Sequence, residues 1–185
     1  MPLNKLQEND LLTVLAWRNS PEVRRYMFSN REISEADHRS WFRQLADNPS
    51  AFWYLHQNDN YILDGVVYFT EYCPDKRSAV WGFYAAPSAL PGAGSKIGLA
   101  ALDKAFGDLN LLALRGEVLE DNERSLRFHE KLGFSRAAGG SQEGHFDGKS
   151  VVGVIHFEIL KLDWFIKRPD IEKRISRRNR SFPSN

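Results

Sequence analysis

The sequence predicts an α/β domain with layered helices and a mixed, mostly antiparallel central sheet. Three observations lead to this prediction. Aromatic and β-branched runs alternate with turn-rich segments in the middle of the chain, helical patterns precede and follow them, and the elements do not repeat as regular βαβ units. At 185 residues the chain has the length of one domain and needs neither a disulfide nor a metal to fold.

The first fifty residues are predicted to be mainly helical. Asn9 and Asp10 precede an apolar run, which is typical of a helix start. Pro21 opens a second, short helix, because proline suits the first helical position. Ser34 and Asp37 have the spacing of a capping box and mark a third helix.

Three consecutive runs, AFWYLH, GVVYFTEY and SAVWGFYA, predict antiparallel strands. The segments between them, around QNDNY and CPDKR, are rich in turn-forming residues. These strands should form the centre of the sheet.

The second half predicts helix, strand, helix and two strands. A helix follows the glycine-rich segment LPGAGSKIG, the run LLALRGEVL is the next strand, and a helix spans residues 122–132. Asp147-Gly148 lies between the last two strands and is a strong hairpin signal.

Composition narrows the class of protein. No apolar stretch is long enough to cross a membrane, and the N-terminus has no apolar signal segment. Cys73 is the only cysteine, and the five histidines have no close metal-ligand spacing. We expect a soluble cytoplasmic protein with no membrane partner and no metal, although the sequence leaves open a site built from distant residues.

Charge is distributed unevenly along the chain. Residues 161–185 contain eight basic and three acidic side chains, a net charge of +5, so residues 1–160 carry −4. Because a nucleic-acid binder normally spreads positive charge over its folded body, nucleic acid is an unlikely partner. We expect a domain over residues 1–160 and a basic C-terminal extension over 161–185, either solvated or in contact with an anionic partner.

The segment Gly92-Ala93-Gly94-Ser95-Lys96 stands between a predicted strand and a predicted helix. Glycines there let a ligand approach the backbone N–H groups, and the helix adds its positive N-terminal dipole. The expected ligand is a phosphate or pyrophosphate. The spacing fits neither a Walker A loop nor a complete dinucleotide fingerprint, and a turn that serves only strand–helix geometry explains it equally well.

A second motif, NERSLRFHEKLGF, covers residues 122–134. Asn122 can cap a helix that Gly133 ends. His129 lies near the C-terminal end of this helix, where the dipole favours a protonated ring, and histidine can exchange protons near neutral pH. A structural role for His129 is the alternative.

In this chain the NERSLRFHEKLGF motif follows the glycine segment by about 30 residues. The two motifs at this spacing together resemble the GCN5-related N-acetyltransferase (GNAT) family. The resemblance covers roughly residues 1–160 and implies the GNAT fold, with acetyl-CoA as co-substrate. Two positions depart from the family pattern. Ala89 stands where the family usually has Arg or Gln, and His129 stands where tyrosine is usual.

The resemblance assigns roles to individual residues. His129 would protonate the CoA sulfur, Glu117 would act as base through water, and a backbone N–H near Tyr84 would stabilise the oxyanion. The pantetheine would bind along the backbone of Phe83 and Tyr84 like an added strand. The expected cofactor-binding residues are Phe83, Tyr84, Gly92, Ala93, Gly94, Ser95, Lys96, Asn122, Ser125, Phe128 and Lys131.

The N-terminal segment AWRNSPEVRRYMFSNREISEADHRSWF resembles the nucleotide-sugar acetyltransferases of pseudaminic acid biosynthesis. This implies that the substrate is a small UDP-aminosugar, a UDP-linked amino-dideoxy sugar that is acetylated on its 4-amino group. The resemblance does not decide whether the protein forms a homodimer. Arginines would pair with the diphosphate and apolar side chains would contact uracil or the sugar methyl group. The expected substrate-binding residues are Arg18, Arg25, Tyr26, Met27, Phe28, Trp41 and Trp53.

Two other functions remain open at this point. One is a ribosomal-protein or other protein N-terminal acetyltransferase, which shares part of the N-terminal pattern. The other is a non-catalytic acyl-CoA-binding module, for which Ala89 is the only support.

Overall fold

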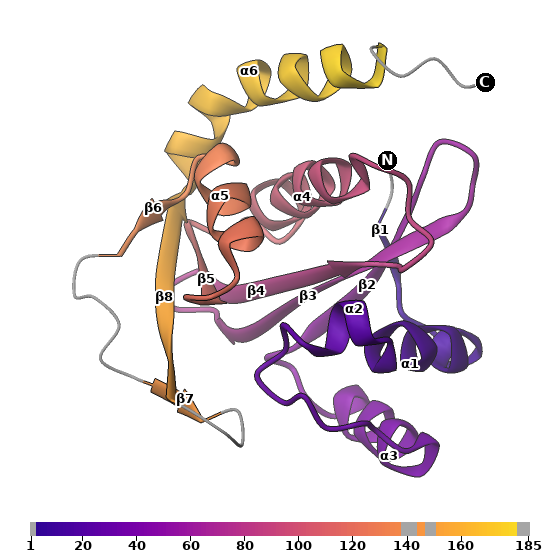
Figure 1. The fold of residues 1–185 in the computed structure, drawn as a ribbon. Helices are drawn as coiled ribbons and strands as arrows, with labels where there is room; N and C mark the ends of the chain where they lie inside the picture. The colour runs from indigo at the N-terminus through magenta and orange to yellow at the C-terminus, as the bar shows by residue number, and fades with distance from the viewer. Residues whose placement is uncertain (1–2, 138–143, 147–150, 181–185) are drawn as a thin grey trace.

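The computed structural model describes residues 3–137, 144–146 and 151–180 (Figure 1). Within this part of the chain, eight strands form one sheet in the order β1-β2-β3-β4-β5-β8-β6, and β7 pairs with β8 off this path. The strands are β1 (Leu3–Lys5), β2 (Phe52–Gln57), β3 (Leu63–Cys73), β4 (Ser78–Ala85), β5 (Ala113–Leu119), β6 (Ser135–Arg136), β7 (Gly144–Phe146) and β8 (Val151–Leu160).

Six α-helices accompany the described strands. They are α1 (Leu11–Asn19), α2 (Pro21–Arg24), α3 (Glu35–Ala46), α4 (Ala93–Asp103), α5 (Glu123–Lys131) and α6 (Lys161–Arg180). A 3-10 turn (Glu8–Asp10) precedes α1, and a π-helical turn (Lys104–Asp108) follows α4. Within the described residues, no helix is both long and apolar enough to cross a membrane.

The predicted mixed sheet is confirmed. Strands β2, β3 and β4 are consecutive and antiparallel, β4 and β5 are parallel, and β5 pairs antiparallel with β8. The predicted final pair also forms, because Phe146 in β7 lies opposite Val151 in β8. The turn residues Asp147-Gly148 lie outside the described residues, and the short β6 was not predicted.

Local capping chemistry sets the helix starts. The Ser34 side chain accepts a hydrogen bond from the Asp37 backbone N–H at 3.1 Å, and α3 begins at the next residue. In the same way Asn122 accepts from the Ser125 N–H at 3.1 Å at the start of α5. Both caps were predicted from the sequence and are confirmed.

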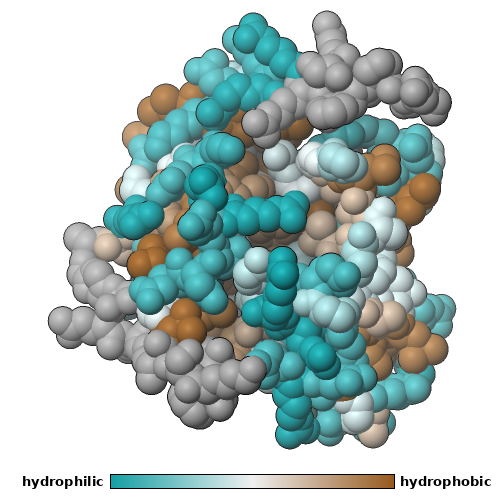
Figure 2. All heavy atoms as spheres, in the orientation of Figure 1, coloured by the Kyte–Doolittle hydropathy of each residue, from teal (hydrophilic) through white to brown (hydrophobic). Residues whose placement is uncertain are grey.

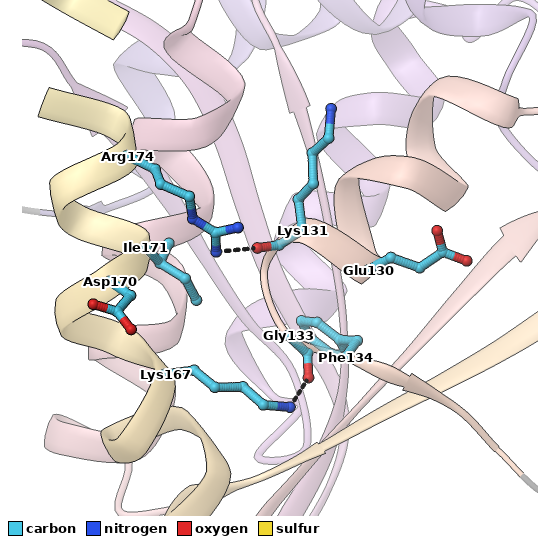
Figure 3. Close-up of a pocket in the computed structure, with 8 residues that line it drawn as sticks. All are labelled: Glu130, Lys131, Gly133, Phe134, Lys167, Asp170, Ile171 and Arg174. Carbon is cyan, nitrogen blue, oxygen red and sulfur yellow. Dashed lines mark hydrogen bonds between the residues drawn. The ribbon is translucent and has the colours of Figure 1, made fainter. Parts of the chain in front are cut away.

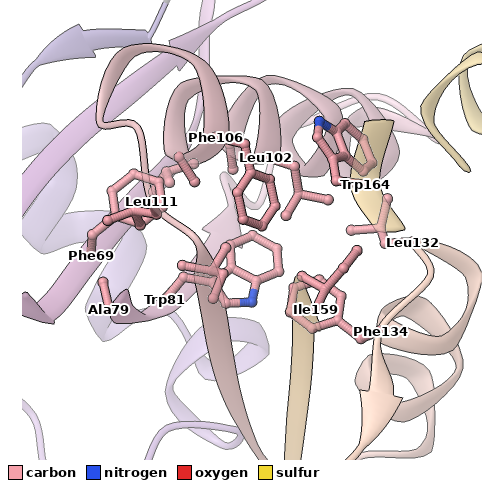
Figure 4. Close-up of a cluster of buried hydrophobic side chains, with 14 of the residues drawn as sticks. Phe69, Ala79, Trp81, Leu102, Phe106, Leu111, Leu132, Phe134, Ile159 and Trp164 are labelled. Carbon is pink, nitrogen blue, oxygen red and sulfur yellow. The ribbon is translucent and has the colours of Figure 1, made fainter. Parts of the chain in front are cut away.

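Helices cover both faces of the sheet: α4, α5 and α6 lie on one face and α1, α2 and α3 on the other (Figure 1). The first face carries the larger core, in which Trp81, Phe106, Phe134 and Trp164 pack together (Figure 4). Successive strand residues serve opposite faces. Phe83 in β4 packs against the large core, whereas Tyr84 belongs to the smaller one under α1–α3.

The expectation of a solvated extension after residue 160 is wrong for helix α6. Trp164 is fully buried in the large core and donates from Nε1 to Asp103 at 3.3 Å. Arg168 binds both oxygens of the same carboxylate, at 2.7 and 2.8 Å, and Ile171 is buried one turn further on. The physical reason is the helical spacing of these side chains, which directs them to one side. Helix α6 continues through Pro169, although proline removes one helix hydrogen bond.

Candidate active site

Strands β4 and β5 separate in the middle of the sheet. Their parallel pairing runs from Ser78 and Ala113 to Trp81 and Gly116. Beyond this point β4 continues to Ala85 and β5 to Leu119, and no pairing joins them within the described chain. The backbone groups on these two facing edges are therefore available to a ligand that enters between the strands.

The predicted glycine turn lies at the end of β4 and leads into α4. Gly92 is in the left-handed region at φ +92°, where a side chain would be strained, and α4 begins at Ala93. In the described structure no side chain caps this helix N-terminus and no acidic residue lies in its first turn. The first turn of α4 therefore contributes no negative side chain of its own to the positive end of the dipole.

The backbone at Gly94 is open to a ligand. A Cβ added there would meet only the Phe83 ring, at 3.8 Å, among the described atoms. Three N–H groups of this turn are already used locally. Ala93 donates to Leu90 and Ser95 donates to Gly92, both at 3.0 Å, and Lys96 donates to Gly92 at 3.4 Å. The residues around Gly94 thus fit a pyrophosphate held by the open helix end and by Lys96.

Lys96 has a partner that the sequence did not predict. Its Nζ lies 2.7 Å from a carboxylate oxygen of Asp59, which comes from the turn between β2 and β3. The hydrogen bond from Lys96 lowers the pKa of Asp59, and the carboxylate is exposed. The ion pair holds the ammonium group beside the first turn of α4.

Several predicted cofactor residues lie together below this turn. The rings of Phe83 and Phe128 are 4.7 Å apart, and Trp81 stacks on Phe83 at 5.4 Å. Ser95, Phe128 and Lys131 line one pocket. Asn122 caps α5, and Ser125 precedes His129 by one turn. Ala89 packs against the large core as an apolar residue.

His129 is buried in an aromatic enclosure. The ring is 4% exposed, stacks on Phe157 at 5.0 Å and meets Trp81 and Phe134 edge-on at 5.4 and 5.1 Å. Its Nδ1 lies 2.9 Å from the Ser125 carbonyl oxygen. Because a carbonyl only accepts, Nδ1 carries the proton and Nε2 of the neutral ring is an acceptor.

The charge state of His129 differs from the sequence expectation. Burial lowers its pKa to about 4, although the bond to Ser125 acts in the opposite direction. The helix dipole was expected to favour the protonated ring, and this was wrong because loss of hydration outweighs the dipole at this depth. At neutral pH the group offers a lone pair at Nε2.

Polar atoms converge at Gly116, where β4 and β5 part. A Cβ on Gly116 would lie 3.0 Å from His129 Nε2 and 3.1 Å from Trp81 Nε1. The Trp81 N–H is buried and has no partner within the described chain. A buried donor without a partner costs free energy, which is typical of functional sites. Trp81 and Gly116 were not among the predicted site residues.

Glu117 reaches this region from the other face of the sheet. Val118 lies in the large core, so its neighbour Glu117 points to the face of α1–α3. The Glu117 carboxylate lies 3.7 Å from Nδ1 of His156 on β8 and is partly exposed. Its charge also helps to raise the pKa of Tyr68, for which burial is the main cause. His129 and Glu117 therefore approach the opening from opposite sides.

An aromatic row lies on the Glu117 side. His38 stacks on Trp41 at 5.0 Å, Trp41 meets Trp53 edge-on at 4.7 Å, and Trp53 stacks on Tyr68 at 4.4 Å. The Tyr68 ring lies over Gly82, the first β4 residue beyond the paired segment. The structure thus links two predicted residues, Trp41 and Trp53, to the strand opening through Tyr68, which the prediction missed.

Arg18 lies beside the same tyrosines. Its Nη2 donates to the Ser29 carbonyl at 2.6 Å, and its Nη1 is buried without a partner among the described residues. Burial lowers the pKa of Arg18, against the raising influence of Tyr84 and Tyr68. The free Nη1 leaves this guanidinium with donor capacity for an anionic group.

The remaining predicted substrate residues lie in the segment after α2. The Arg25 guanidinium lies over the Tyr26 ring at 4.5 Å, Met27 packs against the small core, and Phe28 is 41% exposed. In the space-filling view hydrophilic side chains cover most of the visible surface, with apolar ones between them (Figure 2).

Comparison with known proteins identifies the family. A family model described as the acetyltransferase (GNAT) domain matches residues 2–135. The chain belongs to the GNAT acetyltransferase family. The predicted membership and fold are confirmed, and this GNAT chain is an acetyl-CoA-dependent N-acetyltransferase.

The chain is similar to two curated relatives named acetyltransferase PseH, from Campylobacter jejuni strains 81-176 and NCTC 11168. Each is 25% identical over 131 residues, which is 71% of this chain and 80% of the relative. A solved spermidine N-acetyltransferase from Vibrio cholerae, in complex with CoA and spermine, superposes with a TM-score of 0.82. It is 22% identical and the match covers 89% of this chain and 97% of that one, which shows the shared fold.

Proposed function

We propose that this GNAT enzyme transfers the acetyl group of acetyl-CoA to the 4-amino group of a UDP-linked amino-dideoxy sugar, as in pseudaminic acid biosynthesis. The similarity to PseH and the N-terminal motif support a nucleotide-sugar substrate. The observation that carries the proposal is the half-buried Arg18 guanidinium, with its unpartnered Nη1 beside Tyr68 and Tyr84.

The pairing of arginines on this face favours an anionic substrate over a polyamine. Arg24, Arg31 and Arg39 each lie within 4.0 Å of a carboxylate. Arg18 and Arg25 are in no ion pair formed by the described residues. A diphosphate would supply the missing negative charge through bidentate hydrogen bonds, whereas a polycation would be repelled.

The aromatic row suits the uncharged parts of the same ligand. Trp41, Trp53 and Tyr68 form a continuous surface from α3 to the strand opening. Aromatic rings provide a stacking surface for a flat base and apolar contact for a deoxy methyl group. Tyr26, Met27 and Phe28 stay in the proposal as further apolar contacts for the substrate.

In the proposed reaction, acetyl-CoA supplies the activated acetyl thioester. Glu117 removes the extra proton of the substrate ammonium group through water. As the amine bonds to the acetyl carbon and the carbon–sulfur bond breaks, His129 Nε2 accepts one of the two amine protons, and the amide product keeps the other. His129 then passes its proton to the departing sulfur. This extends the predicted acid role of His129, because its neutral ring must accept a proton before it can donate one.

The remaining residues of the proposed site hold the cofactor. The pyrophosphate is placed at the start of α4 between Gly92 and Lys96, against those N–H groups that are not already bonded within the turn, and the open edge of β4 at Phe83 and Tyr84 receives the pantetheine. A backbone N–H near Tyr84 is proposed to stabilise the oxyanion.

The test is CoA release with three amines at equal concentration: the UDP-linked 4-amino-4,6-dideoxy sugar, the same sugar without UDP, and spermidine. We expect turnover only with the UDP-linked sugar. Arg18→Gln should raise KM for it by about tenfold or more, the effect of a lost charge-assisted pair. Arg31→Gln is the matched control, because Arg31 is exposed and paired with Asp37. Faster turnover of spermidine by the wild type would overturn the proposal.

A further inference from the structure

A pocket of about 270 Å³ lies between the start of α4, the end of α5 and helix α6. Its apolar lining comes from Phe128, Leu132, Ile171 and Ile175. Its polar lining comes from Ser95, Lys131, Arg174 and Arg177. The described lining therefore joins an apolar floor to three basic side chains and contains no carboxylate.

The pocket adjoins the glycine turn. Ser95 follows Gly94 directly, in the first turn of α4, and Phe128 contacts Phe83 below that turn. A ligand whose pyrophosphate lies at the helix N-terminus can therefore continue into the pocket without crossing another element. The chemistry beyond the pyrophosphate of CoA is a flat adenine and a ribose that carries a 3′-phosphate.

We propose that this pocket binds the 3′-phosphoadenosine end of acetyl-CoA and that Arg174 and Arg177 of α6 recognise the 3′-phosphate. The apolar floor suits the adenine, and guanidinium groups suit a phosphate dianion. Helix α6 is then part of the cofactor site. The inference depends on the use of acetyl-CoA and is independent of which amine is acetylated.

A structural role for Arg174 competes with this proposal. Its Nη2 donates to the Lys131 carbonyl at 3.1 Å, and Lys167 donates to the Gly133 carbonyl at 2.8 Å (Figure 3). Both cations thus cap the C-terminal end of α5. A capping role alone would change the affinity for every form of CoA by the same factor. Recognition of the 3′-phosphate would change only the preference for CoA over 3′-dephospho-CoA.

The experiment measures that preference by titration calorimetry with CoA and with 3′-dephospho-CoA. We expect the wild type to bind CoA about tenfold more tightly, a typical value for charge-assisted hydrogen bonds near a surface. In Arg174→Gln and Arg177→Gln the preference should fall to about threefold or less, since one of two contacts is lost. Thermal unfolding of each variant identifies any loss of folded protein.

Lys173→Gln is the matched control, because it removes one charge from the same helix at an exposed position outside the pocket. It should keep the wild-type preference. The proposal is overturned if the wild type binds both forms equally, or if both arginine variants retain the full preference. It is also overturned if Lys173→Gln lowers the preference as much, which would indicate only the general charge of α6.

Discussion

The two faces of the sheet are built differently. The face covered by α4, α5 and α6 has 20 buried apolar residues in one cluster, against seven under α1–α3 among the described residues. In the described part of the chain, five buried polar atoms have no partner: Arg18 Nη1, Ser20 Oγ and His38 Nε2 belong to the helical layer α1–α3, Trp81 Nε1 belongs to the large core, and His56 Nε2 lies on β2. Such atoms are costly unless a ligand or water meets them.

In the proposed function this difference corresponds to the two ligands, with the cofactor on the face of α4 and the amine on the face of α1–α3. The cofactor face presents backbone N–H groups at the start of α4, which need only glycine and a helix end. The other face presents side chains whose positions depend on how distant elements pack. We infer that the larger core keeps the cofactor site rigid, whereas the smaller face is adapted to one amine.

The largest expected effect concerns His129, which reaches from the cofactor face to the opening. His129→Ala should lower the rate constant by ~10² to 10⁴, because proton transfer is lost. The dissociation constant of acetyl-CoA should stay within about threefold of the wild-type value, since Nε2 does not contact the pyrophosphate or the pantetheine in the proposal. Single-turnover kinetics and calorimetry measure the two quantities. An unchanged rate constant would mean that His129 only fills the aromatic enclosure.

The next largest effect concerns stability. It is expected when the indole of Trp164, which packs α6 against the larger core, is removed. Trp164→Ala should lower the free energy of unfolding by about 3–5 kcal/mol, the usual cost of truncating a buried large aromatic residue. Leu162→Ala is the control on the same helix, because Leu162 is 71% exposed and should change the free energy by less than about 0.5 kcal/mol. Equal effects in urea denaturation would show that α6 does not belong to the core.

Helix α6 also shows what sequence reasoning missed and why. Trp164, Arg168, Ile171 and Ile175 recur at helical spacing, so the pattern of a packed face was visible. The high charge of the segment dominated the interpretation instead. Asp103, which binds Arg168 and Trp164, lies about 60 residues earlier in the chain, and no local rule predicts such a partner.

The core around His129 should make stability depend on pH. Its pKa is about 4 in the folded state and 6.5 for an exposed histidine of the unfolded chain, so the unfolded state binds more protons between these values. Stability is therefore fully present above pH 6.5 and falls as the pH decreases toward 4, by roughly 3 kcal/mol in total.

His129→Phe should remove this contribution, since phenylalanine does not titrate. His38 also has a pKa lowered mainly by burial and remains in both proteins, so the difference between them isolates His129. Urea unfolding from about pH 4.5 to 7 gives the two curves. If they run parallel, the ring of His129 is hydrated in the folded state.

The candidate site was predictable only where its chemistry is local. The glycine turn, the Asn122 cap and His129 follow from short motifs. Trp81, Gly116 and Tyr68 were missed, because their importance comes from the point where β4 and β5 part and from the pairing of Trp53 with Tyr68. The parallel register of β4 with β5 and the antiparallel register of β2 with β3 fix these two features, and the sequence did not define either register.

The smallest expected effect separates ligand binding from folding at the glycine turn. In Gly94→Ala the new methyl group meets only Phe83 at ordinary contact distance, so the free energy of unfolding should change by less than about 1 kcal/mol. The same methyl group stands where a pyrophosphate would approach the backbone. The dissociation constant of acetyl-CoA should rise about tenfold, equivalent to one charge-assisted hydrogen bond.

Gly107→Ala is the control, because the space around Gly107 is open and it lies away from α4's first turn. Unchanged affinity in Gly94→Ala, measured by calorimetry, would show that the cofactor does not approach the chain at this residue and would remove the main contrast between the two faces.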